Sequence, residues 1–150
     1  RGDGAGGFKS VPGQESGLTI YGEQRGAAVA DFDHDGRTDL VVTENGAETK
    51  LYRNVAAKPG LRIRLLGRAG NTDAIGAVIR WKVGQRFGPA RELHAGSGYW
   101  SQDAAVQVLN VPAEASLQVR WPGGATTTNN VPPGAREIGV ESTGKLTIVR

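Results

Sequence analysis

Four carboxylates lie close together in one short segment of the chain. Asp31, Asp33, Asp35 and Asp39 account for four of its seven Asp residues. Carboxylates at this spacing repel one another and raise each other's pKa values unless a cation neutralises them. Ca²⁺ suits such a segment because it accepts about six to eight oxygen ligands in flexible geometry. We therefore predict a calcium site whose ligands are these four side chains and the backbone carbonyl of Arg37.

The spacing of the acidic residues separates one kind of calcium loop from another. An EF-hand requires a bidentate acid at its twelfth position, which is Val42 here, and a helix on each side. The fourth acid instead stands at the ninth position, directly before the apolar run 40–42, and Gly36 permits a sharp turn. Two alternatives stay open: magnesium, which prefers octahedral geometry and retained waters, and a solvated acidic turn that binds no ion.

Short apolar runs separated by turn residues extend along the chain. Leu61, Ile63 and Leu65 alternate with Arg62 and Arg64. This pattern predicts a strand with its aliphatic side chains in the core and its arginine side chains in solvent. No window of a dozen residues keeps an apolar period of about 3.6, so we expect little helix. The expected strands are 28–32, 40–43, 49–53, 61–65, 77–83, 105–109, 117–121 and 145–149.

The spacing of these runs also predicts the fold class. Strands that recur about every 8 to 12 residues favour an all-β sandwich or barrel. The sequence Lys58-Pro59-Gly60 interrupts the chain. We therefore predict two units, residues 1–57 with the acidic loop and residues 58–150.

Composition excludes several classes of protein. The chain has no Cys, which rules out thiolate zinc sites, iron–sulfur clusters, disulfides and cysteine nucleophiles. Its net charge of +3 comes from single basic residues without a basic run, so nucleic acid is not an expected partner. No apolar stretch approaches the roughly 20 residues of a membrane span. Because the sequence begins at Arg1 and contains no Met, we expect a processed or truncated product.

The acidic loop and its flanks resemble an FG-GAP or VCBS repeat, the unit of integrin-type β-propellers. The resemblance extends over residues 25–30 before the loop and 49–54 after it, and a typical repeat ending stands at Gly2 to Phe8. It implies a calcium site in the loop and a chain that begins within a repeat. Only one whole repeat is present, whereas a closed propeller needs about four to eight blades.

The C-terminal part resembles the ASPIC/UnbV domain, which follows FG-GAP-type repeats in secreted proteins. The resemblance departs at residues 106–116, where this family usually has a His-Phe-Gly-Leu-Gly-like stretch. It implies an extracellular or periplasmic interaction module without established catalytic residues. The matching residues are Asn71, Ile75 to Ile79, Arg91 to Tyr99, Ser101, Gln102 and Val119 to Gly124.

A Gly-rich segment, residues 95–102, is the candidate for ligand contact. Tyr99, Trp100 and Gln102 offer stacking surfaces and hydrogen bonds, and the glycines permit close approach. The alternative interpretation is a strained connection whose aromatic side chains lie in the core.

Taken together, these residues predict a non-enzymatic adhesion or protein-interaction module at the cell surface. An incomplete blade leaves strand edges for upstream repeats or another chain to cover. A glycan ligand, a homo-oligomer and a filament stay possible. Two other functions remain open: a polysaccharide-acting enzyme or its accessory domain, with His94, Tyr99, Trp100 and Asp103 at its site, and a structural subunit of a surface assembly.

Overall fold

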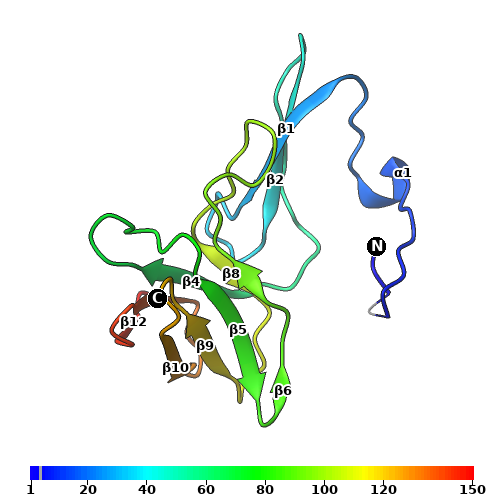
Figure 1. The fold of residues 1–150 in the computed structure, drawn as a ribbon. Helices are drawn as coiled ribbons and strands as arrows, with labels where there is room; N and C mark the ends of the chain where they lie inside the picture. The colour runs from blue at the N-terminus through cyan, green and yellow to red at the C-terminus, as the bar shows by residue number, and fades with distance from the viewer. Residues whose placement is uncertain (4) are drawn as a thin grey trace.

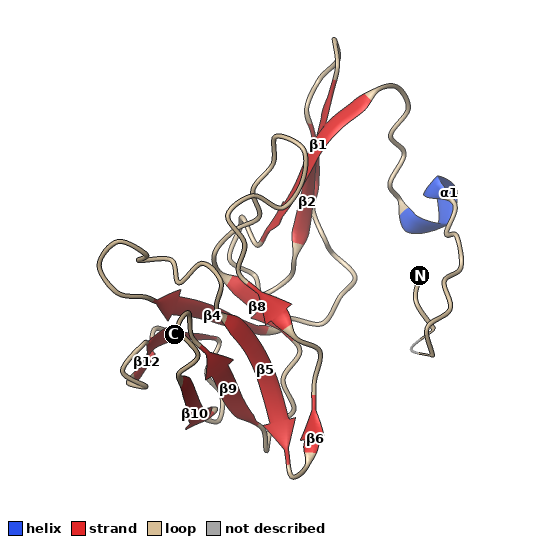
Figure 2. Ribbon diagram, in the orientation of Figure 1, coloured by secondary structure: helices blue, strands red, loops and turns tan. Residues whose placement is uncertain are grey.

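The computed structural model describes residues 1–3 and 5–150, and these are almost entirely β-strand and loop (Figure 2). Within them, the helical content is one turn, α1 (Gly13–Ser16), in the N-terminal segment. The predicted all-β fold class is confirmed, and so is the low helix content. Gly4, which belongs to the predicted repeat ending, lies outside the described residues.

The N-terminal unit contains a three-stranded antiparallel sheet in the order β1-β2-β3. Its strands are β1 (Gln24–Ala30), β2 (Asp39–Glu44) and β3 (Lys50–Tyr52). The acidic loop, residues 31–38, connects β1 to β2, and Ala30 pairs with Asp39 across its base. This register brings the first and last Asp of the acidic segment to the same end of a hairpin.

The C-terminal unit contains two sheets. One has the order β12-β11-β4-β8, and in it β4 pairs in parallel with β11 and antiparallel with β8. The other has the order β10-β9-β5-β6, and β7 also pairs with β5. The strands of the first sheet are β4 (Leu61–Leu66), β8 (Gln107–Leu109), β11 (Glu137–Glu141) and β12 (Leu146–Ile148). Those of the second are β5 (Val78–Val83), β6 (Arg86–Phe87), β7 (Arg91–Glu92), β9 (Ser116–Arg120) and β10 (Thr126–Asn130).

One hydrophobic core joins these two sheets. Leu61, Ile63 and Leu65 are buried on β4, as the alternation predicts. They belong to the same cluster as Leu117 and Val119 of β9 in the other sheet. The two sheets therefore pack as a sandwich, which matches the predicted architecture of the C-terminal unit.

The prediction that the arginine side chains of β4 face solvent is wrong for Arg62. Arg62 lies on the outer face of its sheet, yet only 4% of its surface is exposed. Arg64, two residues further on the same face, is exposed. The difference arises because Asp31 of the acidic loop bonds the Arg62 guanidinium.

The C-terminal unit also reaches the edge of the N-terminal sheet. The Ala104 amide donates to the Val29 carbonyl at 2.9 Å, and the Val29 amide donates to Oδ1 of Asp103 at 2.8 Å. Figure 1 shows a yellow-green loop of the C-terminal unit beside β1. The chain itself therefore covers the edge of β1 at Val29, whereas the boundary near residue 57 stays a prediction.

No helix in residues 1–3 and 5–150 has the length and apolar character that crossing a membrane requires.

Candidate functional site

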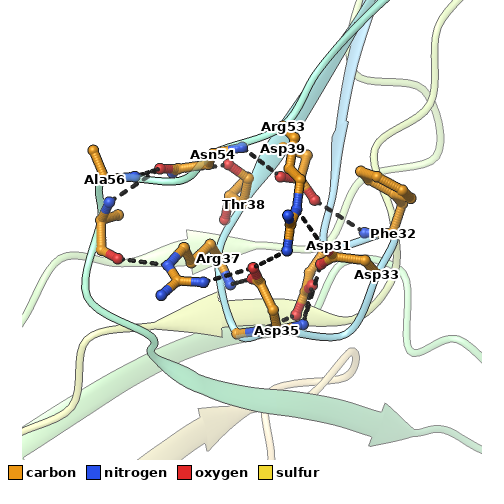
Figure 3. A network of polar contacts seen from close by, with 12 residues as sticks. Asp31, Phe32, Asp33, Asp35, Arg37, Thr38, Asp39, Arg53, Asn54 and Ala56 are labelled. Atoms are coloured by element: carbon orange, nitrogen blue, oxygen red, sulfur yellow. Dashed lines mark hydrogen bonds and ion pairs between the residues drawn. The ribbon is translucent and has the colours of Figure 1, made fainter.

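Three of the predicted ligands converge in the acidic loop (Figure 3). One carboxylate oxygen each of Asp31, Asp33 and Asp39 lies within 4.8 Å of the others. Asp31 and Asp39 are buried, and Asp33 is exposed. Ligands at about 2.4 Å from a single Ca²⁺ lie at most about 4.8 Å apart. The spacing of the three oxygens therefore fits one hard cation.

Backbone amides of the loop hold Asp31 in place. Its Oδ1 accepts from the Asp35 amide at 3.0 Å, and its Oδ2 accepts from the Gly36 amide at 2.9 Å. Gly36 has a φ of 84°, the left-handed conformation that the predicted sharp turn requires. Arg62 also donates to Oδ2 from Nη1. The Asp31 carboxylate is thus fixed by the turn and by a strand of the C-terminal unit.

Asp39 is fixed from two other directions. As the first residue of β2, it accepts at Oδ1 from the Asn54 amide at 2.7 Å and at Oδ2 from the Phe32 amide at 3.2 Å. The Asn54 side chain donates to the Thr38 carbonyl at 3.1 Å. These bonds link both ends of the acidic loop to the segment that follows β3.

Asp35, a fourth predicted ligand, bonds a neighbouring arginine instead of joining the other three. Its Oδ1 accepts from the Arg37 amide at 2.9 Å, and its Oδ2 accepts from Nη1 of Arg37 at 2.6 Å. Burial alone would raise the pKa of Asp35, but these bonds and the charges of Arg37 and Arg53 outweigh it and lower that pKa. A cation that recruits Asp35 has to displace these partners, and the backbone carbonyl of Arg37 stays a predicted ligand.

Arg53 spans two of the acidic side chains. Its Nε donates to Asp33 at 2.6 Å, and its Nη2 donates to Asp35 at 3.4 Å. The bond to Asp33, with the charge of that residue, raises the pKa of Arg53. The acidic spacing predicts that a cation neutralises the carboxylates, and it does not indicate that Arg37, Arg53 and Arg62 also supply positive charge to them.

The second predicted site, the Gly-rich segment 95–102, places its aromatic pair in solvent. The rings of Tyr99 and Trp100 stack with centroids 5.8 Å apart and planes 18° from parallel. Tyr99 is 63% exposed and Trp100 is 90% exposed. Trp100 also has a φ of 48°, a left-handed conformation that is unusual for a bulky residue. The alternative interpretation is wrong in placing these aromatics in the core, whereas the positive φ of Trp100 agrees with its strained connection.

Gln102 serves the backbone of this segment. Its Oε1 accepts from the Gly96 amide, and its Nε2 donates to the carbonyls of His94 at 2.9 Å and Asp103 at 3.1 Å. The Asp103 amide in turn donates to Oγ of Ser97 at 2.8 Å. Gln102, predicted to contact a ligand, thus fixes the loop that presents the aromatic pair.

The residues of the enzyme alternative divide between two places. His94 and Asp103 line a cavity of about 290 Å³ between the two units. Nδ1 of His94 lies 3.8 Å from Oε1 of Glu92. Asp103 accepts from the Val29 amide, and the aromatic pair is not among the residues that line the cavity.

The fold and the loop define an all-β protein with a three-stranded antiparallel sheet in front of a β-sandwich, and one family model matches within each part. The FG-GAP repeat model matches residues 25–51, and the ASPIC and UnbV model matches residues 67–146. The chain belongs to the ASPIC and UnbV family and carries an FG-GAP repeat, in the predicted order.

One relative matches three quarters of the chain. The chain is 29% identical over 119 residues to cartilage acidic protein 1 of Xenopus tropicalis. The match includes 75% of this chain and 18% of that protein, so the chain spans less than a fifth of its relative's length.

Proposed function

We propose that this chain is a non-enzymatic, calcium-binding module for protein interaction outside the cell. The observation that carries the metal part is the convergence of the Asp31, Asp33 and Asp39 carboxylates in an FG-GAP repeat. The ASPIC and UnbV match supports the interaction role. The relative's name, which refers to cartilage, supports an extracellular location.

In this proposal the ion has a structural role. Asp31, Asp33 and Asp39 would hold it, and bound Ca²⁺ would supply the positive charge that lowers repulsion among the loop carboxylates. A ligand that binds only the folded loop stabilises that fold by mass action. The chain's own part is to pre-form the site, with amides of the turn on Asp31 and the Asn54 amide on Asp39.

We further propose the stacked pair Tyr99 and Trp100 as the contact surface. Large aromatic groups with a polar tip contribute strongly to interfaces because they bury much area with few rotatable bonds. The pair is exposed, and bonds of Gln102 and Ser97 fix the loop beneath it. Upstream repeats or another chain are proposed as the partners of the β-sheet edges, and a glycan is the competing ligand for the aromatic pair.

The metal part is tested by calorimetric titration of the whole chain, first stripped with chelator, with Ca²⁺ and separately with Mg²⁺. Asp33→Asn is the test variant because Asp33 is exposed and its side chain bonds Arg53 and the Asp35 amide, not the partners Gly36 and Arg62 of Asp31. Asp73→Asn, an exposed carboxylate in a turn of the C-terminal unit, is the matched control. We expect one calcium site that Asp33→Asn weakens by about tenfold or more, whereas Asp73→Asn leaves it unchanged.

Two results would contradict this expectation. Equal affinity for Ca²⁺ and Mg²⁺ would mean that the loop binds divalent cations in general and is not selective for calcium. Absence of heat and of thermal stabilisation with either ion would leave the acidic loop as a turn neutralised by its arginines.

A further inference from the structure

Arg62 occupies an unusual position between the two units. It stands on β4 in the C-terminal sandwich, on the face opposite the hydrophobic core, and it is buried there. A buried guanidinium is costly unless charged and hydrogen-bonding partners compensate it. The groups that bond the Arg62 guanidinium therefore indicate the role of this residue.

Those partners come from both units. In one direction, Nε of Arg62 donates to Oε2 of Glu137 at 2.9 Å, and the two residues are neighbours in the parallel register of β4 and β11. In the other direction, Nη1 donates to Oδ2 of Asp31 and, at 3.4 Å, to the Asp31 carbonyl. One side chain thus spans from β11 of the sandwich to a ligand of the proposed metal site.

Two further bonds fasten the acidic loop to the chain just before β4. The Gly60 amide donates to the Gly36 carbonyl at 2.8 Å. Nε of Arg37 donates to the Ala57 carbonyl at 2.7 Å. The loop is therefore held near the start of β4 at three points. Of these, Arg62 also bonds Glu137 on β11, the strand that pairs with β4.

The charged groups around Arg62 carry more negative than positive charge. Four carboxylates, those of Asp31, Asp33, Asp35 and Glu137, pair with four arginines in the described residues, and a fifth, Asp39, accepts only from backbone amides. The group thus keeps a net negative charge in a partly buried place, where charge interactions are stronger than in water. A cation bound by Asp31 would lower this charge and would restrain the carboxylate that Arg62 bonds.

We propose that Arg62 is a positioning residue that couples metal binding in the acidic loop to the stability of the C-terminal sandwich. This inference rests on the proposed calcium site. Coupling of this kind is reciprocal: an ion that orders Asp31 stabilises the Arg62 link, and the intact link favours binding of the ion. In this proposal, calcium stabilises the contact between the repeat and the sandwich as well as its own loop.

The test is hydrogen exchange of the whole chain with chelator and with saturating Ca²⁺, read separately in the loop 31–39, in β4 and in β11. Wild-type protein should show slower exchange in all three with calcium, by about tenfold in the strands. Arg62→Lys keeps the charge but loses the planar fork that joins two carboxylates. In this variant we expect calcium to protect the loop and no longer protect β4 and β11.

Arg64→Lys is the matched control, since Arg64 lies on the same strand and face but is exposed. It should behave as wild type. If Arg62→Lys does not fold, Glu137→Gln replaces it, because this change weakens the link at its other end. The proposal is supported if calcium slows exchange in the loop of Glu137→Gln but no longer slows it in β4 and β11.

The outcomes separate this inference from the proposed function. Calcium binding in calorimetry without protection of β4 and β11, or with equal protection in Arg62→Lys, overturns the coupling and leaves the calcium site standing. No calcium binding at all overturns the proposed site and the coupling with it.

Discussion

Gly88 lies directly against the indole ring of Trp81. The Gly88 amide donates to the Trp81 carbonyl at 2.9 Å, which extends the pairing of β5 with β6 beyond Phe87, away from the turn. A Cβ atom placed on Gly88 would overlap the atoms of the indole, among them Cε2 and Nε1. Glycine is therefore required here by the lack of space rather than by a positive φ.

This relationship predicts that Gly88→Ala destabilises the C-terminal sandwich. The new methyl group forces the indole or the turn to move, and such overpacking typically costs about 1–3 kcal/mol. Gly139→Ala is the control, because its Cβ would meet only Cδ1 of Leu66 at 3.7 Å, an ordinary contact. Denaturant unfolding should show the larger loss for Gly88→Ala, and equal losses would contradict the steric argument.

Glu137 makes the stability depend on pH in a defined direction. Burial alone would raise the pKa of Glu137, but the hydrogen bond and charge of Arg62, with Arg150, outweigh it and hold that pKa below its ordinary value of 4.5. A carboxylate whose pKa is lower in the folded state contributes stability above its unfolded pKa. That contribution is lost as the pH falls through the folded pKa.

We therefore expect Glu137→Gln to melt at a lower temperature than wild type at neutral pH. The difference between the two melting temperatures, the gap, should become smaller under acidic conditions. Thermal unfolding of both proteins from about pH 7 to about pH 3 measures this gap. Chelator is present throughout, so that no metal contributes. A gap that stays constant over the whole range would mean that the Arg62 pair does not hold Glu137 ionised.

The sandwich core predicts a large effect of truncation at Leu117. This side chain is fully buried on β9, and Leu→Ala changes in a core typically cost about 2–5 kcal/mol because a cavity remains. Leu51→Ala on β3 is the matched control, since Leu51 is 56% exposed and should lose little. Denaturant unfolding of both variants checks this, and comparable losses would place Leu51 in an interface.

Local patterns predicted β1 to β5, β8, β9 and β12, whereas β6, β7, β10 and β11 were not expected. The alternation of Leu61, Ile63 and Leu65 depends on a period of two, and the structure confirms the buried face. The same pattern placed Arg62 in solvent because its partner Asp31 lies 31 residues away. The parallel pairing of β4 with β11 likewise joins Arg62 to Glu137 across 75 residues, and no nearby pattern indicates such a register.

The acidic site was predictable in part for the same reason. The spacing of Asp31, Asp33 and Asp39 identified three side chains that converge. Asp35 does not join these three side chains, because its carboxylate bonds the side chain of Arg37, two residues further along the chain. The exposure of Trp100 could not be read from its residue type, since aromatic side chains are common both in cores and at interfaces.

The backbone of Trp100 allows its ring and its conformation to be tested apart. Trp100→Ala and Trp100→Gly both remove the stacked ring, so they should weaken any partner of the aromatic pair equally. They differ in the backbone, because a φ of 48° is strained for alanine and free for glycine. Trp100→Gly should therefore be more stable than Trp100→Ala by about 1 kcal/mol in denaturant unfolding. If Trp100→Ala is instead equally stable, the loop relaxes to a negative φ once the ring is gone, and the ring itself maintains the strained conformation that presents it to solvent.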